Sequence, residues 1–291
     1  MERSRGGLGR FAFVGPTLVL LIAFNLFPLL YNVVLSFTNA ELVGDGWKWI
    51  GGRNYERVFT DARFGAAVRR TAWFVFCAVG LELGIGFATA LALQAFTRVR
   101  AVLVTALLIP MMLSPAVMGL FWNLILNGNH GITNQTLDAL SLPQPQWLTD
   151  REWKLFSVIL IDVWMWTPFL MLISMAGLAA IPKTLYEAAE VDRASRWTVF
   201  RRVTLPLVAP YLGLAVLLRF TDALKQFDLV MATQGPNDTS TQTLSTLLYQ
   251  VTFRDGKVGL GSAYACVILV LVIALATVFT RYLETIQRRT A

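Results

Sequence analysis

The chain has 291 residues, of which 56% are hydrophobic and 15% charged, with a mean hydropathy of +0.58. This is more apolar than a soluble domain, and it supplies too few charges to cover a water-facing surface, so an ordinary soluble protein is excluded. The net charge of +7 could accompany nucleic-acid binding. The basic residues lie mainly in short segments beside apolar runs, however, which is the pattern of an integral membrane protein.

Six apolar runs are long enough to cross a bilayer, which predicts an all-α membrane protein. We expect an N-terminal tail over 1–10, a six-helix membrane domain over 11–284 and a C-terminal tail over 285–291. The predicted spans cover about 11–37, 71–96, 101–126, 155–180, 207–232 and 260–282.

Features within the first two spans point to packing rather than chemistry. Pro16 and Pro28 predict kinks in the first span, because neighbouring groups can satisfy the carbonyls that a proline frees. Gly80 and Gly84 form a GxxxG spacing in the second span, which lets another helix approach closely.

Two cysteines inside apolar runs and one histidine in a loop offer neither a disulfide framework nor a metal site.

Ionisable side chains inside spans are costly unless they face protein or water, so they are functional candidates. This chain places six of them there: Glu82, Asp162, Arg219, Asp222, Lys225 and Asp228. At 100° per residue, Arg219, Asp222 and Gln226 form one polar stripe on the fifth span. On the fourth span, Asp162 shares a face with the aromatic residues Trp166 and Phe169 by the same geometry.

Carboxylates and amides beside aromatic rings suit a sugar, whose hydroxyls need hydrogen-bond partners and whose C–H faces stack on rings. One interpretation is therefore that the fourth and fifth spans line a substrate path. Its candidate residues are Asp162, Trp166, Phe169, Arg219, Asp222, Lys225, Gln226 and Asp228. The alternative is that Arg219 pairs with Asp222 and Lys225 with Asp228, and that these pairs only hold helices together. Glu82 is expected to bond between helices rather than to carry protons.

The segment 181–206 is a charged interruption between the fourth and fifth spans. Pro182 suits a first helical turn, and apolar residues then recur at helical spacing beside two glutamates, which predicts a short amphipathic helix. Ser195 is a candidate N-cap for a second short helix over 196–204 that ends before Pro206.

The same segment carries a family signature. Glu187-Ala188-Ala189, followed by Asp192 and by Leu205-Pro206, resembles the EAA signature of the permease subunits of bacterial ABC importers. In that family the loop is a cytoplasmic helix-turn-helix that docks into a cleft of the ATPase subunit. The resemblance implies that ATPase coupling belongs to Tyr186, Glu187, Ala188, Ala189, Asp192, Arg193, Ala194, Leu205 and Pro206.

Arg193 departs from the signature, because the family usually has glycine at this position. Glycine ends a helix in the left-handed conformation at little cost, whereas arginine in that conformation costs roughly 1 kcal/mol. We therefore expect a turn of a different shape, or a contact between Arg193 and the partner.

The resemblance extends over most of the chain, notably from Asn54 to Phe64 and around Gly235-Pro236, and it is to the MalF/UgpA-type permeases of carbohydrate importers. It implies the type I ABC importer permease fold and ATP-driven import of a sugar, oligosaccharide, polyol or glycerol phosphate. The implied partners are a second homologous permease subunit, two ABC ATPase subunits, an extracytoplasmic binding protein and membrane lipid, but no nucleic acid.

The chain itself is not expected to be an enzyme. It has no GxxxxGK[ST] phosphate loop and no hydrolase or metalloprotease motif, so it binds no cofactor and no metal of its own. ATP and magnesium would belong to the partner ATPase. An ion-coupled secondary transporter that uses Glu82 or Asp162 as a proton site, or a channel or scaffold subunit, is the alternative.

Charge counts predict the orientation. The N-terminal tail, 97–100, 181–206 and the end from Arg281 onward hold 13 Lys and Arg against 5 Asp and Glu, whereas 37–70, 127–154 and 233–259 hold 10 against 9. Because Lys and Arg accumulate on the cytoplasmic side, both termini and the 181–206 loop are expected in the cytoplasm of a bacterial inner membrane.

Overall fold

The computed structural model describes residues 14–44, 46–96 and 98–290, with side chains as far as residue 285. The predicted N-terminal tail over 1–10 lies outside these residues. Within them the chain is helical between its turns and carries one isolated β-bridge, Thr38 with Trp49. It divides into two compact units, Met1–Gly65 with Leu248–Leu271, and Ala66–Leu247 with Val272–Ala291.

Five helices of the described chain are long and apolar enough to cross a membrane. They are Val14–Ser36, Ala62–Leu93, Arg151–Ala179, Arg196–Ala223 and Val258–Thr285. A single helix over the third predicted span, 101–126, is absent, and this is a correction. The chain there forms α5 (Arg100–Leu108), a 3₁₀ turn η2 (Pro110–Met112) and α6 (Pro115–Ile125). Ser114 is extended because the proline after it disfavours helical geometry.

In the first unit, Val14–Ser36 is one helix that includes a π-turn, η1 (Ile22–Leu26), and α2 (Phe27–Ser36). The N–H of Phe27 donates to the carbonyl of Ile22, so the wide turn comes just before Pro28. As predicted, this proline does not break the helix. The unit also contains α3 (Arg53–Thr60), a π-turn η4 (Gln250–Arg254) and the beginning of α14 (Val258–Thr290).

Several polar contacts hold the first unit together, among them those of Asn54 and Tyr264. The amide of Asn54 donates to the carbonyls of Ser36 and Thr38 at 2.9 and 2.7 Å, which fixes the turn after α2. The Tyr264 hydroxyl donates to Asp61 at 2.8 Å, which ties α14 to the residue before α4.

Burial raises the pKa of Asp61, but hydrogen bonds from Arg63 and Tyr264 outweigh burial, so the pKa lies below its ordinary value.

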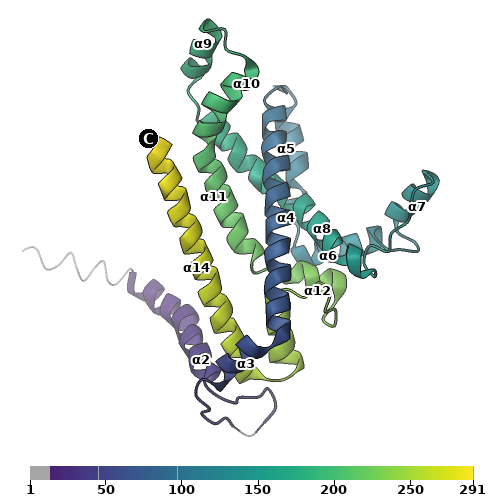
Figure 1. Ribbon diagram of the computed structural model, residues 1–291, viewed down its shortest axis with the longest axis vertical. Coiled ribbons are helices and arrows are strands. Elements are labelled where there is room, and N and C mark those ends of the chain that lie inside the picture. The colour runs from purple at the N-terminus through teal and green to yellow at the C-terminus, as the bar shows by residue number, and fades with distance from the viewer. Residues whose placement is uncertain (1–13, 45, 97, 291) are drawn as a thin grey trace, which may run out of the picture. The chain divides into compact units, whose positions relative to one another are not determined.

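The second unit packs around α4 (Ala62–Leu93), α8 (Arg151–Ala179) and α11 (Leu205–Ala223) (Figure 1). Its core includes Phe74, Ile161 and Leu229, all fully buried. A Cβ added at Gly86 would lie 2.9 Å from the Leu170 Cβ, so this glycine sets the close approach of α4 and α8. Among the described residues, no atom lies within 4 Å of a Cβ built at Gly80 or Gly84, so the predicted GxxxG makes no close helix contact there.

The fifth predicted span, 207–232, is also discontinuous. It forms α11 and then α12 (Asp228–Gln234), with a break over 224–227. No proline or glycine lies in the break. Instead, the Thr243 hydroxyl donates to the carbonyl of Gln226 at 3.0 Å, so contacts from elsewhere in the unit hold the break. The second unit also contains α7 (Ile132–Ala139) and most of α13 (Leu244–Tyr249), whose last two residues belong to the first unit.

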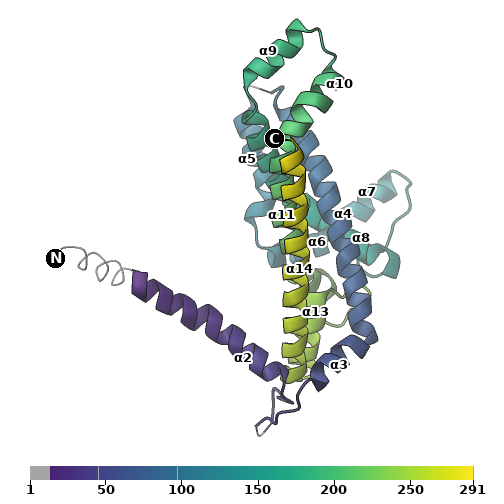
Figure 2. The ribbon, with the colours of Figure 1, turned by 60° about the vertical axis from the view of Figure 1, so that its left-hand side comes forward.

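Two short helices, α9 (Lys183–Val191) and α10 (Arg196–Val199), project from one end of the second unit (Figures 1 and 2). Neither has a buried residue. They correspond to the charged interruption predicted over 181–206, which therefore lies outside the packed core.

Candidate functional site

Arg219 is the centre of a buried cluster of charged side chains in the second unit. Its Nε and Nη2 donate to the two carboxylate oxygens of Glu82 at 2.9 and 3.1 Å, and Nη2 also donates to Asp162. All three side chains are at most 1% exposed. Because the three residues lie on α11, α4 and α8, one guanidinium joins three helices.

Asp222 and Gln226 extend this cluster to its exposed edge. Arg219 Nη1 donates to Asp222 at 3.2 Å, and the Asp222 side chain is 57% exposed. The Gln226 amide donates to Asp162 at 2.8 Å. The polar stripe predicted on the fifth span is therefore present, although Gln226 reaches it from beyond the end of α11.

Aromatic rings flank the cluster as predicted for the fourth span. The Arg219 guanidinium carbon lies 5.0 Å from the centre of the Trp166 ring, which is cation–π geometry. Phe169 packs edge-on against Trp166 with ring centres 6.3 Å apart, and both rings are partly exposed. The exposed edge thus combines a carboxylate, an amide and two rings.

Lys225 and Asp228 take no part in this cluster. Both side chains are exposed, and the expected ion pair between them is absent from the described residues. The break after α11 explains the difference, since the i, i+3 spacing brings side chains together only on a continuous helix.

Sequence reasoning missed the contacts of Arg219 with Glu82 and with Asp162. The interpretation that Glu82 bonds between helices agrees with the structure, but Arg219 was assigned to Asp222 alone. A signal was available: a buried carboxylate in one apolar helix needs a buried cation, and Arg219 is the arginine within the fifth span.

The loop after α12 is fixed by Asp238. Its carboxylate accepts hydrogen bonds from Ser240 and Thr241 and forms an ion pair with Lys154 of α8 at 3.2 Å. Burial raises the pKa of Asp238, but the hydrogen bonds from Thr241 and Ser240 and the Lys154 ammonium outweigh burial. The pKa of Asp238 therefore lies below its ordinary value.

The projecting loop has the two helices that its sequence predicts. The Ser195 hydroxyl accepts the N–H of Thr198 at 3.2 Å, which confirms this residue as the N-cap of α10. The second helix does not end before Pro206, and this is a correction. A π-turn, η3 (Phe200–Thr204), precedes the proline, and the helix continues into α11.

Arg193 has a left-handed backbone, with φ at +51°. Its N–H donates to the carbonyl of Glu190 at 3.0 Å, and the N–H of Ala194 donates to that of Ala189 at 2.9 Å. This is the hydrogen-bond pattern of the Schellman motif. The expectation of a differently shaped turn is therefore wrong, because two backbone hydrogen bonds hold arginine where glycine is usual.

The residues of the signature are arranged around this turn. Tyr186 faces inward, with its hydroxyl 3.2 Å from that of Thr204. The others expose at least part of their surface: Glu187, Ala188, Ala189, Asp192, Arg193, Ala194, Leu205 and Pro206. Exposed apolar side chains accompany them, with Val191 at 83% and Leu185 at 40%. The loop is thus an amphipathic surface that the rest of its own unit leaves largely exposed.

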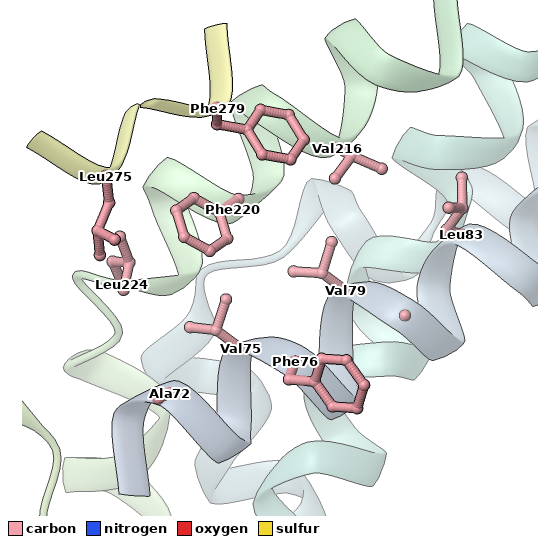
Figure 3. A pocket seen from close by; sticks show the side chains of 11 residues that line it. Ala72, Val75, Phe76, Val79, Leu83, Val216, Phe220, Leu224, Leu275 and Phe279 are labelled. Carbon is pink, nitrogen blue, oxygen red and sulfur yellow. The ribbon is translucent and has the colours of Figure 1, made fainter. Parts of the chain in front are cut away.

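A cavity of about 480 Å³ lies between α4, α11 and α14 in the second unit (Figure 3). Its walls are apolar side chains, among them Val79, Phe220 and Phe279. It offers no polar side chain to a sugar hydroxyl, so the polar edge of the Arg219 cluster is the better candidate for contact with a carbohydrate.

Comparison with known proteins places most of this chain in a family. Residues 83–290 match the model of the "Binding-protein-dependent transport system inner membrane component" family. The chain belongs to this family.

Curated members have similar lengths. A trehalose/maltose transport system permease protein, MalF, of Thermococcus litoralis is 33% identical over 91% of this chain and 90% of its own. A trehalose transport system permease protein, SugA, of Mycobacterium tuberculosis is 32% identical over 93% and 87%.

A solved structure supports the fold. A bacterial ABC transporter involved in the import of the acidic polysaccharide alginate contains a chain that matches with a TM-score of 0.86. That match covers 98% of this family member and 99% of the other chain, at 20% sequence identity. At that identity the likeness concerns the fold, which is that of an ABC importer permease.

Proposed function

We propose that this chain is the membrane permease subunit of an ATP-driven importer for a carbohydrate that an extracytoplasmic binding protein delivers. The assembly would contain a second homologous permease subunit and two ABC ATPase subunits that hold ATP and magnesium. Relatives named for trehalose, maltose and sulfoquinovosyl glycerol support a carbohydrate. The carboxylate, amide and rings at the edge of the Arg219 cluster have the chemistry to bind one.

One observation carries the coupling role. The helix that begins at Arg196 beside the exposed loop runs without interruption to Ala223, and Arg219 lies on it. Fourteen residues separate Leu205 from Arg219, or about 21 Å at 1.5 Å per residue. A displacement of the loop by an ATPase would therefore be passed to the Arg219 cluster along one continuous helix.

The loop would lie in the cytoplasm together with both chain termini. The excess of Lys and Arg in 181–206 and in the segments on its side of the membrane supports this orientation. The secondary-transporter alternative needs a carboxylate that is free to exchange protons. In this structure Glu82 and Asp162 both contact Arg219, which favours the ATP-driven reading.

The test is a pull-down of the tagged chain from its native membrane, with mass spectrometry and an ATPase assay, for wild type and Glu187→Ala. We expect wild type to recover a P-loop ATPase and a second permease. Because Glu187 lies exposed on α9, its loss should leave membrane insertion intact and reduce ATPase recovery or substrate-stimulated hydrolysis at least tenfold.

Glu56→Ala is the matched control, since Glu56 is an exposed glutamate on another short helix, α3. It should behave as wild type. Normal ATP-driven uptake by Glu187→Ala would contradict the docking role. Mild cross-linking in intact membranes that recovers no ATPase from wild type would contradict the importer itself.

A further inference from the structure

A hollow lined by basic and aromatic side chains lies where the projecting loop joins the spanning helix. It has a volume of about 490 Å³ and is lined by Trp197, Thr198, Arg201 and Arg202. Trp197 and Arg201 are four positions apart along α10 and η3, as are Thr198 and Arg202, so these two adjacent pairs lie on one side of the helix. The wide π-turn is part of that face, and π-turns are frequent at functional sites.

Ring packing holds the tryptophan of this hollow in place, whereas the charges of its two arginines are not neutralised by ion pairs among the described residues. Trp197 is 67% exposed, yet its ring stacks on Phe200 with centres 5.6 Å apart, and Phe200 packs against Phe87 of α4. Arg201 and Arg202 are exposed. Neither arginine takes part in any ion pair found among the described residues.

Helix length places the two arginines at the level of lipid headgroups. Arg196–Ala223 has 28 residues and is therefore about 42 Å long, whereas the hydrocarbon core is about 30 Å thick. About eight residues must lie outside the core. The basic N-terminal end of this helix is the part that avoids hydrocarbon, so Arg201 and Arg202 lie at the boundary between the hydrocarbon core and the headgroups. Trp197 lies beside them, and tryptophan is enriched at that boundary.

We propose that Trp197, Thr198, Arg201 and Arg202 bind the phosphate of an anionic membrane phospholipid. Guanidinium groups bind phosphate oxygens through paired hydrogen bonds. The Thr198 hydroxyl lies 2.8 Å from that of Ser195, so it can accept from Ser195 and donate its own proton to the phosphate. Trp197 would lie against the glycerol and upper acyl region. The proposal needs only that Arg196–Ala223 spans the membrane, so it stands or fails independently of the ATP-driven function.

The experiment is native mass spectrometry of the full-length chain in a neutral detergent, titrated with phosphatidylglycerol. At about 1 kcal/mol per basic side chain, R201Q/R202Q should weaken binding by about 2 kcal/mol, or about thirtyfold. R98Q/R100Q is the matched control, because this basic pair lies in another turn of the same unit and does not line the hollow. It should retain wild-type affinity.

Several results would overturn the proposal. These are equal binding of phosphatidylcholine, equal affinity of wild type and R201Q/R202Q, or equally tight binding of soluble glycerol 3-phosphate, which would indicate a free-phosphate site. Loss of ATPase recovery by R201Q/R202Q with unchanged lipid binding would show a protein-docking surface instead.

A second variant keeps the proposal testable if R201Q/R202Q does not fold. R201K/R202K keeps both charges and removes the planar fork, so it should bind phosphatidylglycerol several-fold more weakly than wild type. Unchanged affinity in this variant would contradict guanidinium recognition of the phosphate.

Discussion

At the scale of single residues, Arg219 has the largest structural role that the contacts support. A buried ion pair is weak evidence for stability by itself, because removing charges from water costs several kcal/mol per ion. Here one guanidinium meets two carboxylates that are almost completely buried and on different helices. The arrangement therefore specifies how α4, α8 and α11 pack rather than adding much net stability.

Arg219→Met should leave Glu82 and Asp162 buried without a cation. Removing one partner of a buried pair typically costs about 3–5 kcal/mol, so we expect a large loss of folded protein. Fluorescence-detected size-exclusion chromatography in detergent measures it. A monodisperse variant with wild-type thermal stability would contradict this role of Arg219.

Asp222→Ala is the contrasting change in the same cluster, because that side chain is 57% exposed. It should leave the amount of folded protein near wild type and lower carbohydrate uptake per molecule. Reduced folded protein with normal uptake per molecule would instead assign Asp222 to helix packing.

At the scale of elements, the turn between α9 and α10 shows how backbone hydrogen bonding overrides a residue preference. Left-handed geometry costs arginine about 1 kcal/mol relative to glycine, but the two closing hydrogen bonds also satisfy carbonyls at the end of α9. The helix end thus keeps its shape with an unfavourable residue at Arg193.

Arg193→Gly should therefore preserve the loop and stabilise it by about 1 kcal/mol, while Arg193→Val should disrupt it, because a β-branched residue is strongly disfavoured at positive φ. ATP-driven uptake and limited proteolysis of the loop would report both effects. Rapid cleavage of the glycine variant with slow cleavage of the valine variant would contradict this account.

The loop held by Asp238 gives a prediction about pH. Its folded-state pKa is depressed, so the ionised carboxylate stabilises the fold above the ordinary pKa of 3.8, and this contribution is lost as pH falls through the folded value. Asp238→Asn should lower stability by roughly 1–2 kcal/mol at neutral pH.

Thermal unfolding midpoints of wild type and Asp238→Asn should therefore stay apart from neutral pH to about pH 5 and converge below about pH 4. Ser240→Ala, made in the protein that retains Asp238, removes one hydrogen-bond donor to the carboxylate. Its unfolding midpoint should therefore lie closer to that of Asp238→Asn than the wild-type midpoint does. A difference that persists unchanged at the lowest pH would show that ionisation of Asp238 is not its cause.

At the scale of the whole chain, composition and local chemistry predicted the all-helical fold, and the Ser195 cap was accessible because it depends on a few adjacent residues. Breaks were harder. Pro110 and Pro115 carried a signal, but the break over 224–227 depends on Thr243, which no local pattern reveals. The partner of Glu82 was missed for the same reason, since Arg219 lies 137 positions away.

Orientation in the membrane is the whole-chain property to test. In a variant with Cys77 and Cys266 replaced by serine, a cysteine placed at Thr184 in α9 should react with a membrane-impermeant maleimide only after permeabilisation. One placed at Asp138 in α7 should react in intact cells. The opposite pattern would invert the proposed topology and remove the loop from the ATPase.

The uncovered first helix bears on the order of synthesis. None of the apolar window in Val14–Ser36 is buried by the described residues of its own unit, and its mean hydropathy is 2.3. Its insertion into the bilayer thus draws mainly on the hydropathy of its own side chains. This segment can leave the ribosome and insert before any other span exists, so the buried charges of Glu82, Asp162 and Arg219 enter a membrane in which the chain is already anchored.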